Sequence, residues 1–255
     1  MNNKNKYILS IESTGKICSV ALFSFNENAN EKYELISEYS IFVGNKHDKF
    51  LAELCNRILT DNELTVNDLA AVAVSVGPGS FTGLRIGVAL AKGLCFDYSE
   101  NYNCDSEENC SISEKNNSIK LIAVPTLKAL SFRVGEFLNF FNDSKFNFNK
   151  YFQVLSVIPS HSDLVYEQLF DANNNSLTEI TFSKITEIKD KYSKNESLFL
   201  STNGKIEVDF GIYLPEFSQI TAATVGKLAI QMYRNNEFSE PDELVPLYVQ
   251  DFVPR

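Results

Sequence analysis

The chain has few of the residues that build metal sites and nucleophilic centres. Only two histidines occur among its 255 residues, His47 and His161, and they lie far apart in the sequence. The five cysteines form no Cys-x-x-Cys motif, and no Gly-x-Ser-x-Gly nucleophile elbow is present. These absences exclude the common short motifs of zinc sites and serine hydrolases, so we predict no metal site and no catalytic residue in this chain.

Long apolar runs and clusters of basic residues are also missing. No apolar run could span a membrane, and residues 1–6 lack the apolar core of a signal peptide, so we expect a cytoplasmic protein without membrane contact. The formal net charge is −10, and no basic patch offers cations to phosphate groups. We therefore expect that the chain does not hold nucleic acid by itself and that, if its pathway involves RNA, another subunit supplies the cations. The odd number of cysteines favours reduced thiols.

Apolar strands and amphipathic helices alternate along the first half of the chain. Three meandering strands, a helix, a buried strand and a second helix follow one another, and this order is typical of half of an actin-like domain. The second half begins with another hairpin. We predict an α/β protein of the actin-like ATPase (ASKHA, RNase H-like) superfold, with two related α/β lobes, the second degenerate. The predicted parts are an N-terminal lobe at 1–141 with a surface insertion at 97–120, a smaller C-terminal lobe at 142–240 and an extended tail at 241–255.

The most specific segment is 75–87, Ser-Val-Gly-Pro-Gly-Ser-Phe-Thr-Gly-Leu-Arg-Ile-Gly. It places a glycine-proline-glycine turn between a buried strand and a helix, and Ser80 is a natural N-cap facing the amides of Thr82 or Gly83. Such a turn either exposes backbone N–H groups to an anion or simply turns the chain tightly. Its spacing fits neither a P-loop nor a Rossmann fingerprint. The motif loop comprises Gly77, Pro78, Gly79, Ser80, Phe81, Thr82 and Arg85.

The helix expected at 84–96 is apolar around its whole circumference and must therefore be covered on every side. Gly83, Gly87 and Ala91 form a smooth stripe along it, where another backbone can come close. That backbone belongs either to the same domain or to a partner subunit. We expect an exposed stripe that binds a partner, so that a bulky residue at Gly87 would abolish pairing and leave the monomer folded.

The phosphate-binding turns that enzymes of this superfold use for ATP are altered or missing. The first turn is Glu12-Ser-Thr-Gly15, with glutamate in place of aspartate, and the second hairpin carries Pro-Ser-His-Ser-Asp at 159–163. The sequence Asp-Phe-Gly at 209–211 is interpreted as a loop. We expect no cofactor in the isolated chain, while a nucleotide at a subunit boundary remains open.

Several segments together resemble the TsaB (YeaZ) family. They are Ile-Leu-Ser-Ile-Glu-Ser-Thr at 8–14, Cys-Ser-Val-Ala-Leu at 18–22, His47 and, most specifically, 76–87, followed by Val-Pro-Thr-Leu at 124–127 and Pro-Leu-Tyr-Val at 246–249. The resemblance implies a non-catalytic subunit that pairs with the related subunit TsaD. That pair, with the ATPase TsaE, transfers a threonylcarbamoyl group to the adenosine beside the anticodon of certain tRNAs.

The resemblance also implies where the partner binds. In the family, the first two helices pack against equivalent helices of TsaD, and the same surface could form a homodimer in the isolated protein. The interface residues expected on this basis are Leu51, Leu54, Ile58, Gly83, Leu84, Gly87, Val88 and Ala91.

Two departures from the family pattern affect its arginines. Ile-Pro-Ser-His at 158–161 stands where relatives have an Asp-Ala-Arg segment, and Gln250 replaces an arginine near the end. A glycoprotease-like hydrolase or a small-molecule kinase of the same superfold is the alternative function, and tight magnesium-dependent binding of ATP would favour the kinase.

Overall fold

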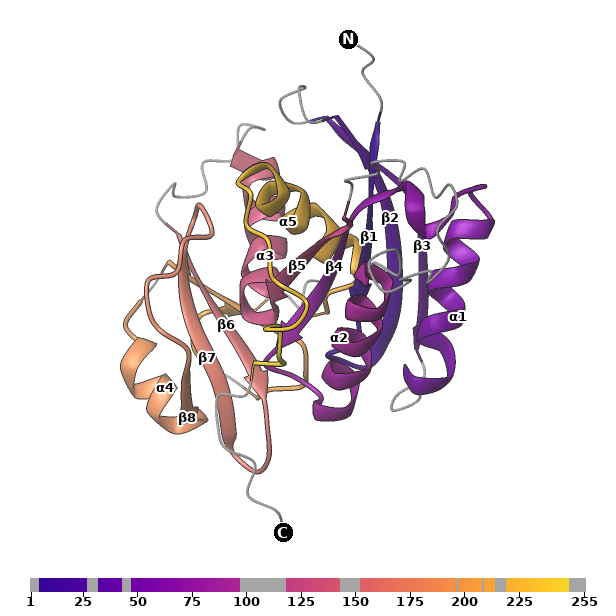
Figure 1. Ribbon diagram of the computed structural model, residues 1–255. Helices are drawn as coiled ribbons and strands as arrows, with labels where there is room; N and C mark the ends of the chain where they lie inside the picture. Colours follow the sequence, from indigo (N-terminus) through magenta and orange to yellow (C-terminus); the bar gives the residue numbers. More distant parts are fainter. Residues whose placement is uncertain are drawn as a thin grey trace, which may run out of the picture.

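The structure is a computed structural model and describes residues 5–26, 32–42, 47–96, 118–142, 152–195, 197–207, 209–213 and 219–247. Most of the predicted insertion and the end of the predicted tail lie outside these residues, as do Cys104, Cys110 and Gln250. Figure 1 shows two α/β units side by side, each built on its own sheet.

The first sheet has five strands in the order β3-β2-β1-β4-β5. The three strands of the predicted meander pair antiparallel, and the two later strands run parallel to β1. Its strands are β1 (Lys6–Glu12), β2 (Ile17–Phe25), β3 (Tyr33–Phe42), β4 (Leu69–Gly77) and β5 (Lys120–Pro125). The helices that follow β3 and β4 are α1 (His47–Thr60) and α2 (Phe81–Cys95), and the short 3₁₀ turn η1 (Val66–Asp68) precedes β4.

The second sheet repeats this arrangement in the order β8-β7-β6-β9-β10. Its first three strands again form an antiparallel meander, and β9 and β10 again run parallel to the first strand of that meander. Its elements are β6 (Gln153–Pro159), β7 (Leu164–Asp171), β8 (Thr181–Lys184), α4 (Ile185–Tyr192), β9 (Leu198–Thr202) and β10 (Ile212–Tyr213). The repeated topology confirms the predicted class of two related α/β lobes.

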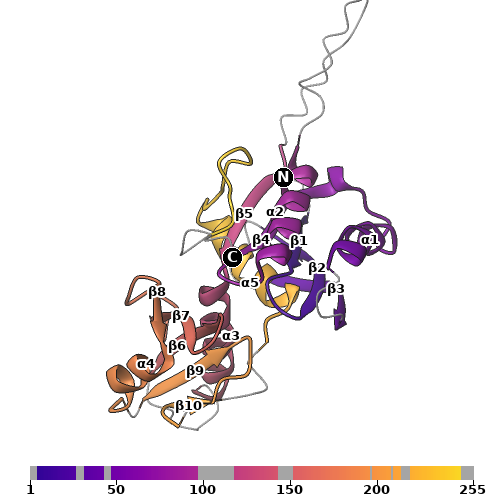
Figure 2. The same cartoon turned by 90° about the horizontal axis from the view of Figure 1, so that it is seen from below.

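Two helices lie between the sheets, α3 (Thr126–Asn142) and α5 (Ala222–Arg234). Figure 2 shows them between the two lobes, and they contact one another. The helix that follows the first sheet, α3, packs mainly on β6 and β9 of the second sheet, whereas α5 packs mainly on β1 and β2 of the first. Each lobe therefore supplies a helix to the other, and they share one apolar core between the sheets.

The helix α5, which falls within the predicted C-terminal lobe at 142–240, packs on the first sheet. The Ser10 hydroxyl donates to the carbonyl oxygen of Ala222 at 2.7 Å, and the Ala222 amide donates to the Ser19 hydroxyl at 2.8 Å. A Cβ at Gly226 would lie 2.3 Å from the ring of Phe23. Sequence order alone assigned this helix to the second lobe, but these buried contacts attach it to the first sheet.

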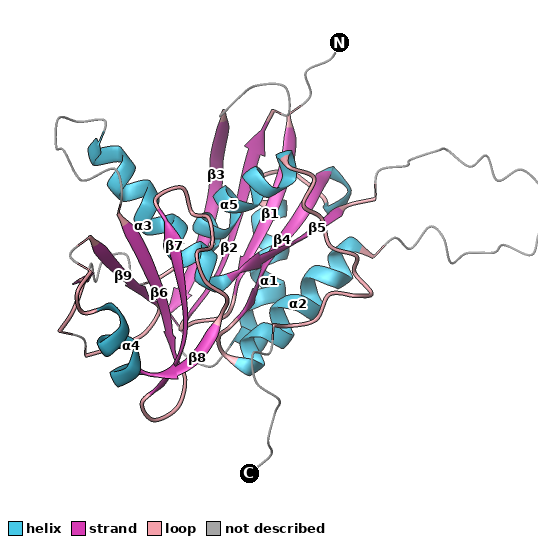
Figure 3. Ribbon diagram, turned by 90° about the vertical axis from the view of Figure 1, so that its left-hand side faces the viewer, coloured by secondary structure: helices cyan, strands magenta, loops and turns pink. Residues whose placement is uncertain are grey.

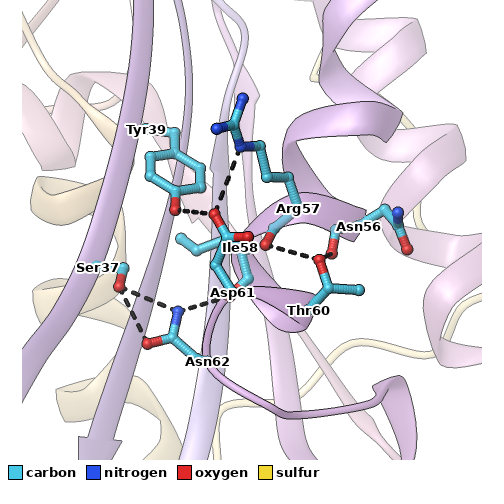
Figure 4. Close-up of polar contacts among 8 residues, drawn as sticks. All are labelled: Ser37, Tyr39, Asn56, Arg57, Ile58, Thr60, Asp61 and Asn62. Atoms are coloured by element: carbon cyan, nitrogen blue, oxygen red, sulfur yellow. Dashed lines mark hydrogen bonds and ion pairs between the residues drawn. The ribbon is translucent and has the colours of Figure 1, made fainter.

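The end of α1 is fixed to the edge strand β3 by polar contacts (Figure 4). The Tyr39 hydroxyl donates to Asp61 at 2.6 Å, and Arg57 lies 3.4 Å from the same carboxylate. The bond from Tyr39 lowers the pKa of Asp61. Asn62 donates both to Ser37 and to the carbonyl oxygen of Ile58, at 3.0 and 2.6 Å. These bonds hold α1 over the outer face of the first sheet.

Three of the five cysteines lie in the core of the first lobe. Cys18, Cys55 and Cys95 are free and buried. Burial raises the pKa of Cys18 to about 11 and those of Cys55 and Cys95 to about 12. Among the described residues, no helix is long and apolar enough to cross a membrane.

Candidate functional site

The motif loop lies where β4 ends and α2 begins. Gly77 has a φ of 110°, which favours glycine, and the peptide bond between Gly77 and Pro78 is cis. The Ser80 hydroxyl accepts from the Gly83 amide at 3.3 Å and caps α2, as the sequence predicted.

Several amides that could face an anion bind partners within the chain instead. The Gly77 amide donates to the Thr126 hydroxyl at 3.1 Å, and the Ser80 amide donates to the carbonyl oxygen of Thr14 at 2.8 Å. The Gly83 amide is occupied by the cap. Because these donors are already bonded, the geometry favours an architectural role for the loop over an anion cradle.

The turn between β1 and β2 approaches the motif loop through a buried carboxylate. Glu12 is 1% exposed and accepts from the amide and the hydroxyl of Thr14, at 2.6 and 2.5 Å. Its other oxygen accepts from the Ser75 hydroxyl at the end of β4. Burial raises the pKa of Glu12, although the bonds from Ser75 and Thr14 act in the opposite direction. Through these hydrogen bonds, Glu12 links the end of β1 to the end of β4 within the first lobe.

The glycine stripe of α2 lies directly on this turn. A Cβ at Gly83 would lie 2.0 Å from the carbonyl oxygen of Ser13, and one at Gly87 would lie 2.4 Å from the Ser13 hydroxyl oxygen. A Cβ at Gly79 would lie 2.7 Å from the Cβ of Thr14. The Ser13 hydroxyl also donates to the carbonyl oxygen of Gly83 at 2.8 Å. The backbone that packs closely on the glycine stripe therefore belongs to the β1–β2 turn of the same lobe.

This packing corrects the predicted exposed stripe. All eight residues assigned to the partner interface are buried in the monomer, namely Leu51, Leu54, Ile58, Gly83, Leu84, Gly87, Val88 and Ala91. A helix that is apolar on every side does not reveal from its sequence which side the sheet covers. A bulky residue at Gly87 would collide with Ser13 and disturb the monomer, so that substitution is not a clean test of pairing.

The outer surface of α2 is formed by other residues. Thr82, Arg85, Ala89 and Gly93 are exposed, and Ile86 and Leu90 are half-buried between them. The guanidinium of Arg85 lies 3.8 Å from the centroid of the Phe81 ring. On the neighbouring helix, Ala52, Glu53, Asn56 and Arg57 are exposed. Figure 3 shows α1 and α2 next to one another, and we call these exposed faces together the α1–α2 outer face.

A segment near the C-terminus also reaches the motif loop. The Leu247 amide donates to the carbonyl oxygen of Val76 at 2.7 Å, and the Leu247 carbonyl oxygen lies 3.2 Å from where a Cβ of Gly77 would be. No sequence pattern predicted this contact, although residues 246–249 were part of the family resemblance.

Among the described residues, no group of three or more His, Cys, Asp or Glu side chains could hold a metal ion.

Known proteins match this chain in both sequence and structure. Residues 42–101, which include α1, β4, the motif loop and α2, match the family model described as TsaD, tRNA N6-adenosine threonylcarbamoyltransferase. The chain is 36% identical over 87 residues to the Escherichia coli protein TsaB, a tRNA threonylcarbamoyladenosine biosynthesis protein, across 34% of each chain. The Buchnera aphidicola TsaB is 34% identical over 89 residues, which are 35% of this chain and 37% of that protein.

The fold matches over nearly the whole length. YeaZ from Pseudomonas aeruginosa has a TM-score of 0.69 at 16% identity and covers 96% of this chain and 100% of its own. The chain is therefore similar to TsaB proteins over part of its sequence and to YeaZ in its fold. The sequence match spans only about a third of the curated relatives' length. The regions at β1–β2 and the motif loop that suggested the resemblance interlock in this structure.

Proposed function

We propose that this chain is a non-catalytic subunit in the synthesis of threonylcarbamoyladenosine in tRNA, and that it pairs with a TsaD subunit. The observation that carries the proposal is the match to TsaB proteins, whose name states this pathway. The family model that matches α1, β4 and α2 describes TsaD itself. Two chains that share this substructure could pair through equivalent helices.

The interlocked turns support a scaffold rather than an enzyme. Glu12 stands where enzymes of this superfold carry a phosphate-binding aspartate, but it is buried and bonded to Ser75 and Thr14. The amides of Gly77, Ser80 and Gly83 are likewise bonded within the chain. We expect no cofactor in the isolated subunit, and any nucleotide would lie at its boundary with TsaD.

The proposed docking surface for TsaD is the α1–α2 outer face. It presents small and apolar groups at Ala89, Gly93, Ile86 and Leu90, around the exposed cation of Arg85. Small residues on exposed helices allow close approach of a second helix pair. In the absence of TsaD, the same face could form a homodimer.

The net charge of the chain bears on whether it contacts tRNA directly. A net charge of −10 disfavours direct contact with tRNA phosphates, so we assign that contact to the partner subunits. TsaE would dock on the assembled pair, and the complex would act in the cytoplasm. The first test is to co-express the chain with TsaD from the same organism and to look for a stable complex. The second is to deplete the chain from its own cells and to measure threonylcarbamoyladenosine in their tRNA. A stable complex and loss of the modified base are expected. A chain that stays alone, with modification unchanged, would overturn the proposal.

A further inference from the structure

The two lobes differ most on their outer faces. In the first lobe, α1 and α2 lie side by side over one core of the sheet. In the second lobe, α4 covers the corresponding core, and the described residues between β9 and β10, 203–207 and 209–211, contain no helix. Among the described residues of the second lobe, no helix therefore corresponds to α2, and Figure 1 shows α4 at the outer side of that lobe.

A groove lies between α4 and the connection from β9 to β10. Its volume is about 570 Å³. Its lining residues are Ile185, Thr186 and Lys189 from α4 and Ile206, Glu207, Asp209 and Phe210 from the connection. Three of these side chains are large and apolar, and they pack against the core of the second lobe. The groove thus has an apolar floor that continues into that core.

The rim of the groove is polar and carries more acid than base. Lys189 lies 2.5 Å from Asp209 in an ion pair, and the side chains of these two residues are 48% and 69% exposed. Glu207 is exposed beside them. Two carboxylates and one ammonium leave a net negative rim, which favours a ligand with basic groups. Because the rim side chains remain so exposed, the groove suits an extended surface better than a small molecule that must be largely enclosed.

We propose that this groove binds an amphipathic helix of a partner protein, in the place that α2 fills in the first lobe. The apolar face of that helix would lie on Ile185, Ile206 and Phe210, and its lysine or arginine side chains would face Glu207 and Asp209. Helices recognised in this way place apolar anchors at successive turns on the face that enters the groove. The inference rests on the internal repeat and does not depend on the proposed function.

The test uses the full chain and a labelled synthetic helix of leucine and lysine, with the leucines on one face. The controls are a scrambled peptide of the same composition and a peptide with glutamate in place of lysine. Binding is measured by fluorescence anisotropy of the labelled peptide. We expect saturable binding of the leucine–lysine helix and no saturable binding of either control peptide. Glu207→Lys should weaken binding about tenfold, whereas Glu240→Lys, the same charge change at an exposed position outside the groove, should leave binding within about twofold.

Hydrogen exchange then locates the bound peptide. We expect the peptide to slow hydrogen exchange of the backbone amides of α4 in the wild type. In the variant Ile206→Ser, this protection should disappear. The proposal is overturned if no saturable binding occurs, if the scrambled peptide binds equally, or if both charge variants weaken binding alike. Protection confined to α1 and α2 would also overturn it. So would self-association of the chain alone that Glu207→Lys abolishes, because the occupant would then be a second copy.

Discussion

The carbonyl oxygen of Ser13 lies 2.0 Å from the point that a Cβ at Gly83 would occupy. This contact joins the β1–β2 turn to the first turn of α2. It leaves no room for any side chain at residue 83, because the neighbouring atom is backbone and cannot rotate away.

Gly83→Ala should therefore destabilise the protein by about 1–3 kcal/mol or more, since overpacking against backbone forces the helix to move. Gly93 in the same helix is the matched control, because nothing lies within 4 Å of its Cβ position. Gly93→Ala should stabilise by about 0.5–1 kcal/mol through helix propensity. Urea unfolding of both variants measures the difference. Equal effects at the two sites would show that α2 does not sit on the turn as described.

The attachment of α5 to the first sheet gives a second pair of variants. A Cβ at Gly226 would lie 2.3 Å from the Phe23 ring and 2.7 Å from the Ser10 hydroxyl oxygen. Gly226→Ala should cost about 1–3 kcal/mol of stability. At Gly135 in α3, the nearest atom is 4.0 Å away, and alanine should be stabilising by about 0.5–1 kcal/mol. Thermal unfolding compares the two variants, and a tolerated Gly226→Ala would contradict the close packing of α5 on the first sheet.

The buried carboxylate of Glu12 predicts a pH dependence of stability. Burial raises its folded-state pKa above the ordinary value of 4.5, so the folded protein takes up this proton before the unfolded chain does. The stability of the wild type relative to Glu12→Gln should be highest below pH 4.5 and should fall as the pH rises through the folded-state pKa. A series of melting temperatures across this range tests the sign. If the stability of the wild type relative to Glu12→Gln increased as the pH rises, this prediction would be contradicted.

The three buried thiols should react slowly. Because burial raises the pKa values of Cys18, Cys55 and Cys95 to about 11 or 12, almost no thiolate forms near neutral pH. Iodoacetamide should leave these three residues unmodified in the native protein and should label them in urea, as read by mass spectrometry. Rapid native labelling of any of the three would show that its segment opens.

Much of the fold could be predicted from the sequence, because strong apolar periodicity marks its longer elements. The meander of the first three strands, the buried strand before the motif loop and the cap at Ser80 were all predicted. The strands β8 and β10 were not predicted, since short edge strands with half-exposed side chains carry little pattern.

The site was predicted less well than the fold. The sequence identified the motif loop and the close approach of a backbone to Gly83 and Gly87, but it could not tell that the backbone was that of Ser13. The buried and exposed faces of α2 are both apolar or small, so their chemistry does not distinguish them. Contacts of high sequence separation, such as that of Leu247 with Val76, leave no local signal.

The central proposal is that the chain pairs with TsaD through the α1–α2 outer face. Ala89→Arg places a large cation at an exposed position on that face and should leave the fold intact. Gln231→Arg makes the same kind of change on the exposed side of α5 and serves as the control. The measurement is co-purification of each variant with TsaD, alongside its melting temperature. We predict that Ala89→Arg loses the partner while keeping the melting temperature of the wild type, and that Gln231→Arg keeps both. Normal recovery of TsaD by Ala89→Arg would contradict the account.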